Sequence, residues 1–147
     1  LDSQMDCYLD IFGSDNSSEC NLPLSLEQIS AGFPSPADDY MDLSLDLNKE
    51  LIKNPSSTFF ARVKGNSMIG DGINDGDLLV IDKSLNPVEG SIVVAFVDGE
   101  FTLKEICCKS GDLWLMPSNP KYKPIKIEES NNFIIWGIVT YVIKKFK

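Results

Sequence analysis

Two side chains in this sequence, Ser67 and Lys104, could together form an activated nucleophile and its base. Ser67 follows Gly65 by two residues, and a glycine there allows a tight turn that lifts the hydroxyl clear of the backbone. The backbone amides of Ser67 and Met68 could then point towards a developing oxyanion. Lys104 lies in an apolar stretch, where the loss of hydration would lower the pKa of its amine. A neutral amine can accept the serine proton, which is the Ser-Lys variant of the nucleophile-and-base arrangement.

Each of these residues also has an ordinary structural interpretation. Judged by spacing alone, Ser67 could be a polar residue in a loop, and Lys104 could be a surface lysine on a half-exposed strand. Residues 70–77 resemble a calcium loop in composition, but they lack the glutamate at the twelfth position and the flanking helices. Two turns leading into a strand explain that segment better. Spacing alone therefore favours the structural interpretation of both Ser67 and Lys104.

Composition removes several other kinds of catalytic site. The chain contains no histidine, which excludes a Ser-His-Asp triad, a Cys-His dyad and a His-ligated zinc site. Its four cysteines, Cys7, Cys20, Cys107 and Cys108, include no C-x-x-C pair, which argues against a zinc or thioredoxin-like site. The Cys107-Cys108 pair has no histidine to activate a thiolate. We therefore expect no cysteine nucleophile, no metal and no cofactor.

The length and charge of the chain predict an arm and a body. With 147 residues, of which 43% are hydrophobic, it can form one domain with a real core and an appendage. Residues 1–48 hold ten acidic and no basic side chains, whereas residues 49–147 hold 12 acidic and 13 basic ones. The arm is rich in Ser, Asp, Asn and Pro, which is typical of mobile or loosely docked segments. Its apolar residues from Leu22 to Phe33 could dock as an extended strand. We expect an acidic arm over residues 1–45 and a body over residues 46–147.

The same features bear on location and partners. There is no run of 18 apolar residues and no basic stretch followed by an apolar one at the N-terminus, so we expect neither a membrane span nor a secretory signal, and a cytoplasmic protein. The acidic arm argues against direct DNA binding by this chain. The chain begins at Leu1 instead of a methionine, which leaves room for a longer parent chain.

The pattern of the body predicts a mainly β fold. A short helix should begin after Asp46, which can cap it, and end at Asn54-Pro55. Asp98-Gly99 is a strong signal for a two-residue hairpin. Seven strands are expected, over residues 58–63, 78–82, 91–97, 100–106, 113–116, 125–127 and 133–142. Short strands joined by tight turns indicate a compact barrel or a folded-over sheet.

Four segments in order resemble the LexA/UmuD family of self-cleaving serine peptidases of the SOS response, and its UmuD branch most closely. The likeness covers roughly residues 30–147. It is carried by Ala31-Gly32-Phe33-Pro34-Ser35-Pro36-Ala37, Gly65-Asn66-Ser67-Met68-Ile69, Asp75-Gly76-Asp77-Leu78-Leu79 and Asp98-Gly99-Glu100-Phe101-Thr102-Leu103-Lys104. Several ordered segments are far more specific than one motif. The resemblance therefore favours the catalytic interpretation of Ser67 and Lys104.

The resemblance also implies a mechanism. The chain would cut its own Ala31–Gly32 bond, with Ser67 as the nucleophile and an uncharged Lys104 as the base. Presentation of the bond within one chain or one dimer supplies a large effective molarity, so each chain reacts once. The implied partners are a RecA filament on single-stranded DNA, which stimulates cleavage, and a second copy of the chain in a homodimer.

Two outputs of the cleavage remain open. The leading hypothesis is a UmuD-like accessory of a translesion DNA polymerase. The alternative is the peptidase domain of an SOS transcriptional repressor that the same cleavage inactivates. The scissile pair Ala31–Gly32 is of the LexA type, whereas the UmuD branch typically has Cys-Gly, and about 30 residues precede the bond. Because of these departures, the repressor hypothesis remains open.

Overall fold

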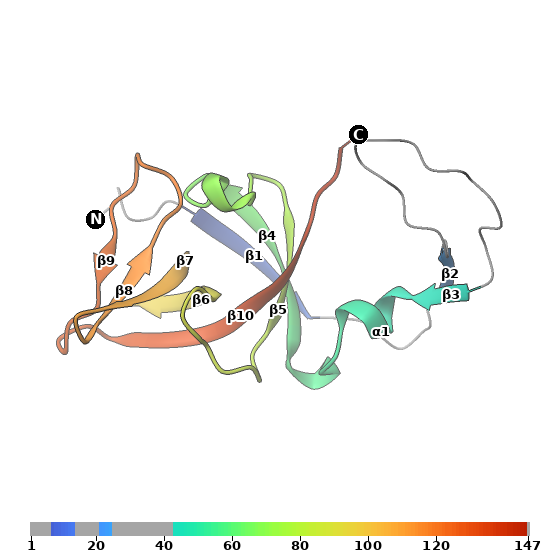
Figure 1. The fold of residues 1–147 in the computed structure, drawn as a ribbon, viewed down its shortest axis with the longest axis horizontal. Coiled ribbons are helices and arrows are strands. Elements are labelled where there is room, and N and C mark those ends of the chain that lie inside the picture. Colours follow the sequence, from blue (N-terminus) through green and yellow to red (C-terminus); the bar gives the residue numbers. More distant parts are fainter. Residues whose placement is uncertain (1–6, 14–20, 25–42, 147) are drawn as a thin grey trace. The chain divides into compact units, whose positions relative to one another are not determined.

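The computed structural model describes residues 7–13, 21–24 and 43–146 (Figure 1). The chain divides into two compact units, one combining Leu1–Ser14 with Ser56–Lys147 and the other spanning Asp15–Pro55. In the described residues, no helix is long and apolar enough to cross a membrane. Neither Ala31 nor Gly32 belongs to the described residues.

In the described part of the larger unit, eight strands form one antiparallel sheet in the order β1-β4-β5-β10-β6-β7-β8-β9. Their bounds are β1 (Cys7–Gly13), β4 (Thr58–Gly65), β5 (Leu78–Asp82), β6 (Ile92–Val97), β7 (Glu100–Lys109), β8 (Asp112–Met116), β9 (Ile125–Lys126) and β10 (Phe133–Ile143). Two short 3-10 helices, η2 (Pro55–Ser57) and η3 (Ile69–Asp71), flank β4. The predicted mainly β fold is confirmed, and each of the seven predicted strands has its counterpart among β4 to β10.

β10 allows the sheet to fold over. Its second half pairs with β5 and its first half pairs with β6, and the register shifts once in each pairing. Such irregularities bend a strand and increase its twist. Gly137 lies at the shift opposite β6, and a Cβ there would lie 2.5 Å from Cγ2 of Ile81. Glycine is therefore needed at this position so that β10 can approach β5, and Figure 1 shows β10 running along both halves of the sheet.

Two clusters of buried apolar side chains form the core of this unit. One lies among β4, β5, β6 and β7 and the segment that follows β4, and comprises Ala61, Val63, Met68, Ile73, Leu79, Ile81, Val94 and Leu103. The other comprises Val93, Ala95, Ile106, Leu115 and Ile138. Neighbouring residues of β6, Val93 and Val94, belong to different clusters. Since side chains alternate along a strand, the apolar run of β6 supplies both faces of the sheet.

The hairpin between β6 and β7 positions the strand that carries Lys104. Asp98 and Gly99 both adopt positive φ angles, 48° and 91°, which is the geometry that a two-residue hairpin turn requires. The Asp98 carboxylate accepts hydrogen bonds from the side-chain amide of Asn131 and the backbone N–H of Asn132. The hairpin predicted from Asp98-Gly99 is therefore confirmed, and it fixes the register in which Lys104 lies opposite Val93.

The smaller unit contains a second, two-stranded sheet and the predicted helix. Strand β2 (Asn21–Leu24) pairs antiparallel with β3 (Leu43–Asp46), and α1 (Leu47–Leu51) follows at once. Asp46 caps α1 by accepting hydrogen bonds from the backbone N–H groups of Asn48 and Lys49. The start of the helix and its cap match the prediction, whereas the helix ends at Leu51, before the expected Asn54-Pro55. β2 shows that part of the arm forms an extended strand, whereas residues 25–42 lie outside the described residues.

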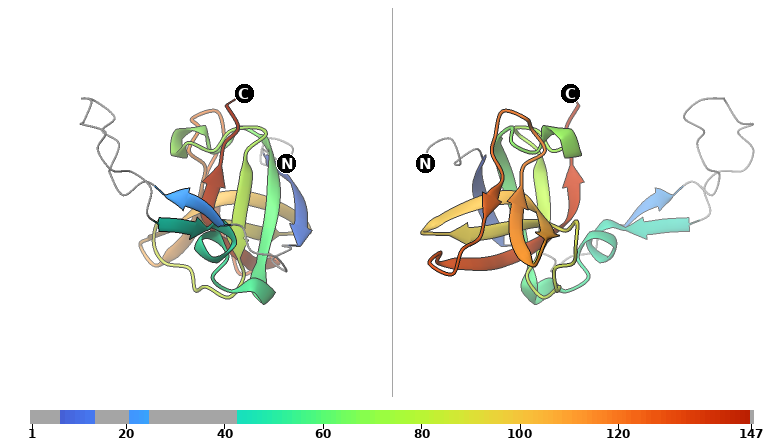
Figure 2. Two further views of the ribbon diagram at one scale, coloured as in Figure 1. Left: turned by 90° about the vertical axis from the view of Figure 1, so that its right-hand side faces the viewer. Right: turned by 60° about the vertical axis from the view of Figure 1, so that its left-hand side comes forward.

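Like β3, β1 was not predicted from the sequence. It lies within the acidic arm, yet it pairs with β4 over seven residues, from Cys7 opposite Gly65 to Gly13 opposite Phe59. Figure 2 shows β1, in dark blue, along the side of β4 that does not face β5. Part of the arm is therefore a strand of the main sheet. The predicted boundary between residues 45 and 46 remains a prediction.

Candidate active site

Ser67 lies in the turn that follows β4. Gly65 ends the strand with a φ of 102°, and its N–H donates to a carboxylate oxygen of Asp75 at 2.9 Å. The chain then turns through Asn66, Ser67 and Met68 into η3. Ser67 is fully buried, and its Oγ has no hydrogen-bond partner in the part of the chain that the structure describes. Buried hydroxyls are nearly always hydrogen-bonded, so this one requires an explanation.

Residues 117–122, which we call the strap, hold this turn through its backbone. The N–H of Ser118 donates to the carbonyl of Ser67 at 2.9 Å, and the N–H of Gly70 donates to the carbonyl of Ser118 at 2.8 Å. A Cβ at Gly70 would lie only 2.3 Å from that same Ser118 oxygen. The strap therefore lies so close to the turn that only glycine fits at position 70.

Side chains of the strap hold the turn as well. Asn119 is buried, and its Nδ2 donates to the carbonyl of Asn66 at 2.9 Å, while its Oδ1 accepts the N–H of Lys121 at 3.0 Å. The hydroxyl of Tyr122 donates to Oδ1 of Asn66 at 2.7 Å. Sequence reasoning missed these residues, because an Asn beside prolines is typical of any turn. The strap therefore holds Asn66, the residue before Ser67, through both its backbone and its side chain.

Lys104 lies in the middle of β7 and is fully buried. Its Nζ donates to Oγ1 of Thr102 at 2.7 Å and to the carbonyl of Leu103 at 3.3 Å. The interpretation of Lys104 as a surface lysine is therefore wrong. Because Ser67 Oγ has no partner in the described residues, Ser67 and Lys104 do not share a hydrogen bond in this structure.

The segments that carry the two residues nevertheless adjoin. Met68, next to Ser67, and Leu103, next to Lys104, belong to the same buried cluster. Glu105, the residue after Lys104, also lies close enough to Asp71 in η3 for the two carboxyl groups to interact. Burial raises the pKa of Glu105 above its usual range, and the negative charge and hydrogen bond of Asp71 raise it further. The turn after β4 thus packs against β7 close to Lys104.

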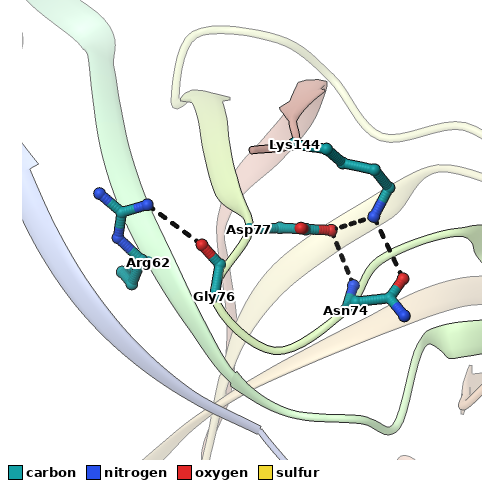
Figure 3. Close-up of polar contacts among 5 residues, drawn as sticks. All are labelled: Arg62, Asn74, Gly76, Asp77 and Lys144. Carbon is teal, nitrogen blue, oxygen red and sulfur yellow. Dashed lines mark hydrogen bonds and ion pairs between the residues drawn. The ribbon is translucent and has the colours of Figure 1, made fainter. Parts of the chain in front are cut away.

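A polar cluster secures the loop between η3 and β5 (Figure 3). The buried carboxylate of Asp77 accepts the N–H of Asn74 at 2.8 Å and forms an ion pair with Lys144, which also donates to Oδ1 of Asn74 at 3.1 Å. Arg62 of β4 donates to the carbonyl of Gly76 at 3.1 Å. The described residues include no group of His, Cys, Asp or Glu that could hold a metal ion. Residues 70–77 form turns that lead into β5, as predicted, and an ion pair holds them.

Cys107 and Cys108 are free thiols near the end of β7. Desolvation raises the pKa of the Cys107 thiol, and a hydrogen bond to Glu89 raises it further. A raised pKa disfavours the nucleophilic thiolate at neutral pH. Cys107 is therefore poorly suited to act as a nucleophile, and Ser67 remains the better candidate.

Comparisons with known proteins find similar sequences over most of the chain. The family model described as Peptidase S24-like matches residues 23–140, a range that contains Ala31–Gly32, Ser67 and Lys104. Protein MucA of Salmonella typhimurium is 43% identical over 135 residues, which make up 90% of this chain and 92% of that protein. Protein ImpA of Shigella flexneri is 42% identical over 124 residues, or 84% and 83% of the two chains. LexA repressor 2 of Pseudomonas putida is 35% identical over 125 residues, 82% of this chain and 59% of the repressor.

Proposed function

The chain belongs to the peptidase S24-like family, and on that premise we propose that it is a self-cleaving serine peptidase with Ser67 as nucleophile and Lys104 as base. The resemblance to the LexA/UmuD family is confirmed by this family match and by the similarity to MucA and ImpA. The observation that carries the proposal is a pair of chemical groups withdrawn from water. A serine hydroxyl without a partner among the described residues and a lysine amine are both fully buried, on segments that adjoin.

Burial of both groups supports this chemistry. Removing the Lys104 amine from water disfavours its charged form, and only the neutral amine can accept a proton. Thr102 Oγ1 and the carbonyl of Leu103 hold the amine in place before the reaction. To act as the base, the amine would have to turn from Thr102 towards Ser67. The resting structure would therefore be an inactive arrangement, which suits a peptidase that waits for a stimulus.

The proposed reaction proceeds in two stages. Lys104 accepts the proton of Ser67, whose oxygen attacks the carbonyl carbon of Ala31. The negative oxygen of the tetrahedral intermediate accepts hydrogen bonds from the backbone amides of Ser67 and Met68. Collapse transfers the proton from Lys104 to the nitrogen of Gly32, which leaves as a free amine, and an ester joins Ala31 to Ser67. Lys104 then takes a proton from water, and the resulting hydroxide attacks the ester carbon. Ser67 leaves and takes that proton back from Lys104, and the new carboxylic acid of Ala31 ionises to a carboxylate.

We propose that the cleavage serves the SOS response in the manner of the UmuD branch. A RecA filament on single-stranded DNA would favour the state in which the Ala31–Gly32 bond lies beside Ser67. Residues 32–147 would then act as a homodimer with a translesion DNA polymerase. The higher identity to MucA than to LexA repressor 2, 43% against 35%, favours this output over a transcriptional repressor. The repressor remains the alternative function.

Intact mass spectrometry of the purified chain at alkaline pH tests the peptidase. High pH favours the neutral amine, so two fragments that meet at Ala31 and Gly32 should accumulate without any partner. They should be absent in Ser67→Ala and in Lys104→Met, which replaces the amine with an apolar chain of similar size. Lys109→Met, an exposed position on the same strand, is the matched control and should cleave normally. An uncleaved chain at high pH and with RecA filaments, or cleavage that survives in Ser67→Ala, would overturn the proposal.

A second assay separates the two outputs. The cleaved protein is added to a translesion polymerase on a primed template that contains an abasic site. An accessory protein should increase primer extension past the lesion, whereas the product of a cleaved repressor should leave it unchanged.

A further inference from the structure

β1 pairs with the edge of β4, the strand that ends two residues before the proposed nucleophile Ser67. β4 is flanked by β5 on one side and by β1 on the other, so without β1 it would be an edge strand. The two strands run antiparallel, with Cys7 opposite Gly65, which precedes Ser67 by two residues. β1 also lies close to β7, the strand that carries Lys104. The segment 7–13 therefore lies along the strands that carry or precede both proposed catalytic residues (Figures 1 and 2).

The exposed edge of a strand is a binding surface in its own right. It presents a row of backbone N–H and C=O groups that will pair with any suitable extended segment. The charged residues of β4 are both basic, namely Arg62 and Lys64, and both are exposed. Residues 1–31, by contrast, hold six acidic side chains and no basic one: Asp2, Asp6, Asp10, Asp15, Glu19 and Glu27. Within residues 7–13 the acidic residue is Asp10, which lies opposite Arg62 in the pairing of β1 with β4, so backbone pairing and charge both favour this segment as the occupant of the edge.

We propose that the edge of β4 is a strand-binding site for residues 7–13, and that this strand stays bound after the chain is cut between it and the body. This inference rests on the proposed function only for its consequence, because β1 lies on the N-terminal side of Ala31–Gly32. Cleavage there would turn β1 from part of the chain into a separate peptide held by pairing alone. The first product would then be a two-chain complex, and the edge of β4 would open only when the peptide dissociates. Loss of the covalent link lowers the effective concentration of β1, which makes that dissociation possible.

The test avoids self-cleavage, so that its result does not depend on the proposed function. The full chain carries Ser67→Ala, and the recognition sequence of a site-specific protease replaces residues 14–20, between β1 and β2. After cutting by that protease, native mass spectrometry at micromolar concentration measures how much of the N-terminal peptide remains with the rest of the chain. We expect most of it to remain, and we expect Leu9→Pro with Ile11→Pro to increase the released fraction at least tenfold. Proline removes backbone donors and disfavours strand pairing.

Hydrogen exchange on the uncut Ser67→Ala chain gives the second readout. The proline pair should lower the protection of edge amides in β4 at least tenfold, while amides in β5 keep theirs, which also shows that the body is folded. Ser3→Pro, in the same arm but outside both β1 and the replaced segment, is the matched control and should change neither measurement. Immediate release of the peptide from the chain without prolines, or unchanged protection of β4 in the proline pair, would overturn the proposal. If self-cleavage fails but the peptide is retained, the strand-binding site stands and the proposed function falls.

Discussion

Asn119 offers a direct test of whether the strap positions Ser67. Its side chain makes two hydrogen bonds, from Nδ2 to the carbonyl of Asn66 and from the N–H of Lys121 to Oδ1. Asn119 is only 5% exposed, so water cannot readily replace either bond. A buried hydrogen bond contributes about 0.5–1.5 kcal/mol to stability, so Asn119→Ala should lower the free energy of unfolding by about 1–3 kcal/mol. Asn86→Ala, at an exposed position between β5 and β6, should change it by less than about 0.5 kcal/mol.

The measurement requires two assays. Urea unfolding, followed by tryptophan fluorescence in a Ser67→Ala background, gives stability without interference from cleavage. Alkaline self-cleavage of the Asn119→Ala chain with Ser67 intact gives the effect on the reaction. A catalytic group misplaced by about 1 Å can slow a reaction on the order of a hundredfold, so we expect cleavage to slow by roughly 10- to 100-fold. The rise of the rate with pH should keep its midpoint, since Asn119 does not contact Lys104 among the hydrogen bonds of the described residues.

Two results would refute this reasoning. If Asn119→Ala and Asn86→Ala unfold at the same urea concentration, the two hydrogen bonds contribute nothing to the folded state. If Asn119→Ala is destabilised but cleaves at the normal rate in conditions where it is fully folded, the strap stabilises the domain without positioning Ser67.

Three further predictions follow from single contacts. Gly70→Ala places a Cβ 2.3 Å from a backbone oxygen of the strap, so its urea midpoint should correspond to a loss of about 1–3 kcal/mol, and an unchanged midpoint would contradict the close approach. The pKa of Glu105 is raised in the folded chain, so the folded state binds this proton more tightly than the unfolded state does. Stability therefore falls as the pH rises from the pKa of the unfolded chain through that of the folded chain. Glu105→Gln should therefore flatten this fall in thermal unfolding measured from pH 4 to 7, and an unaltered slope would count against the burial of that carboxyl. Lys144→Met leaves the buried carboxylate of Asp77 without its ion pair and should lower stability by about 2–3 kcal/mol in urea, whereas Lys145→Met, the matched control, should have little effect.

Local signals predicted most of the body. β6 and β7 were expected because a turn dipeptide separates two apolar runs, and α1 because a capping aspartate precedes an apolar side. In both cases the residues that decide the structure lie within a few positions of one another. The fold class could be predicted for the same reason, since tight turns and short strands leave few alternatives.

Interactions between distant segments could not be predicted in this way. β1 lies in an acidic stretch whose composition is typical of mobile segments, and its strand depends on pairing with β4 about 50 residues later. The burial of Lys104 likewise depends on the whole sheet, because strand alternation alone is compatible with either face. Asn119 gives no signal until its distance to Asn66 is known. The scissile bond Ala31–Gly32, the assignment of Ser67 and Lys104 as catalytic residues and the boundary of the arm remain predictions.

The strap has a consequence for the timing of the reaction during synthesis. The turn at Ser67 is held by Ser118 and Asn119, which leave the ribosome about 50 residues later, and β10 must follow before β5 and β6 are joined. A chain still being made therefore holds the arm and the nucleophile long before it can organise them. We expect a chain that ends before residue 117 to remain uncut at alkaline pH, as intact mass would show, whereas cleavage of such a fragment would mean that the turn forms without the strap. If such a fragment remains uncut, the late position of the strap in the sequence protects each newly made chain from self-cleavage before it has folded.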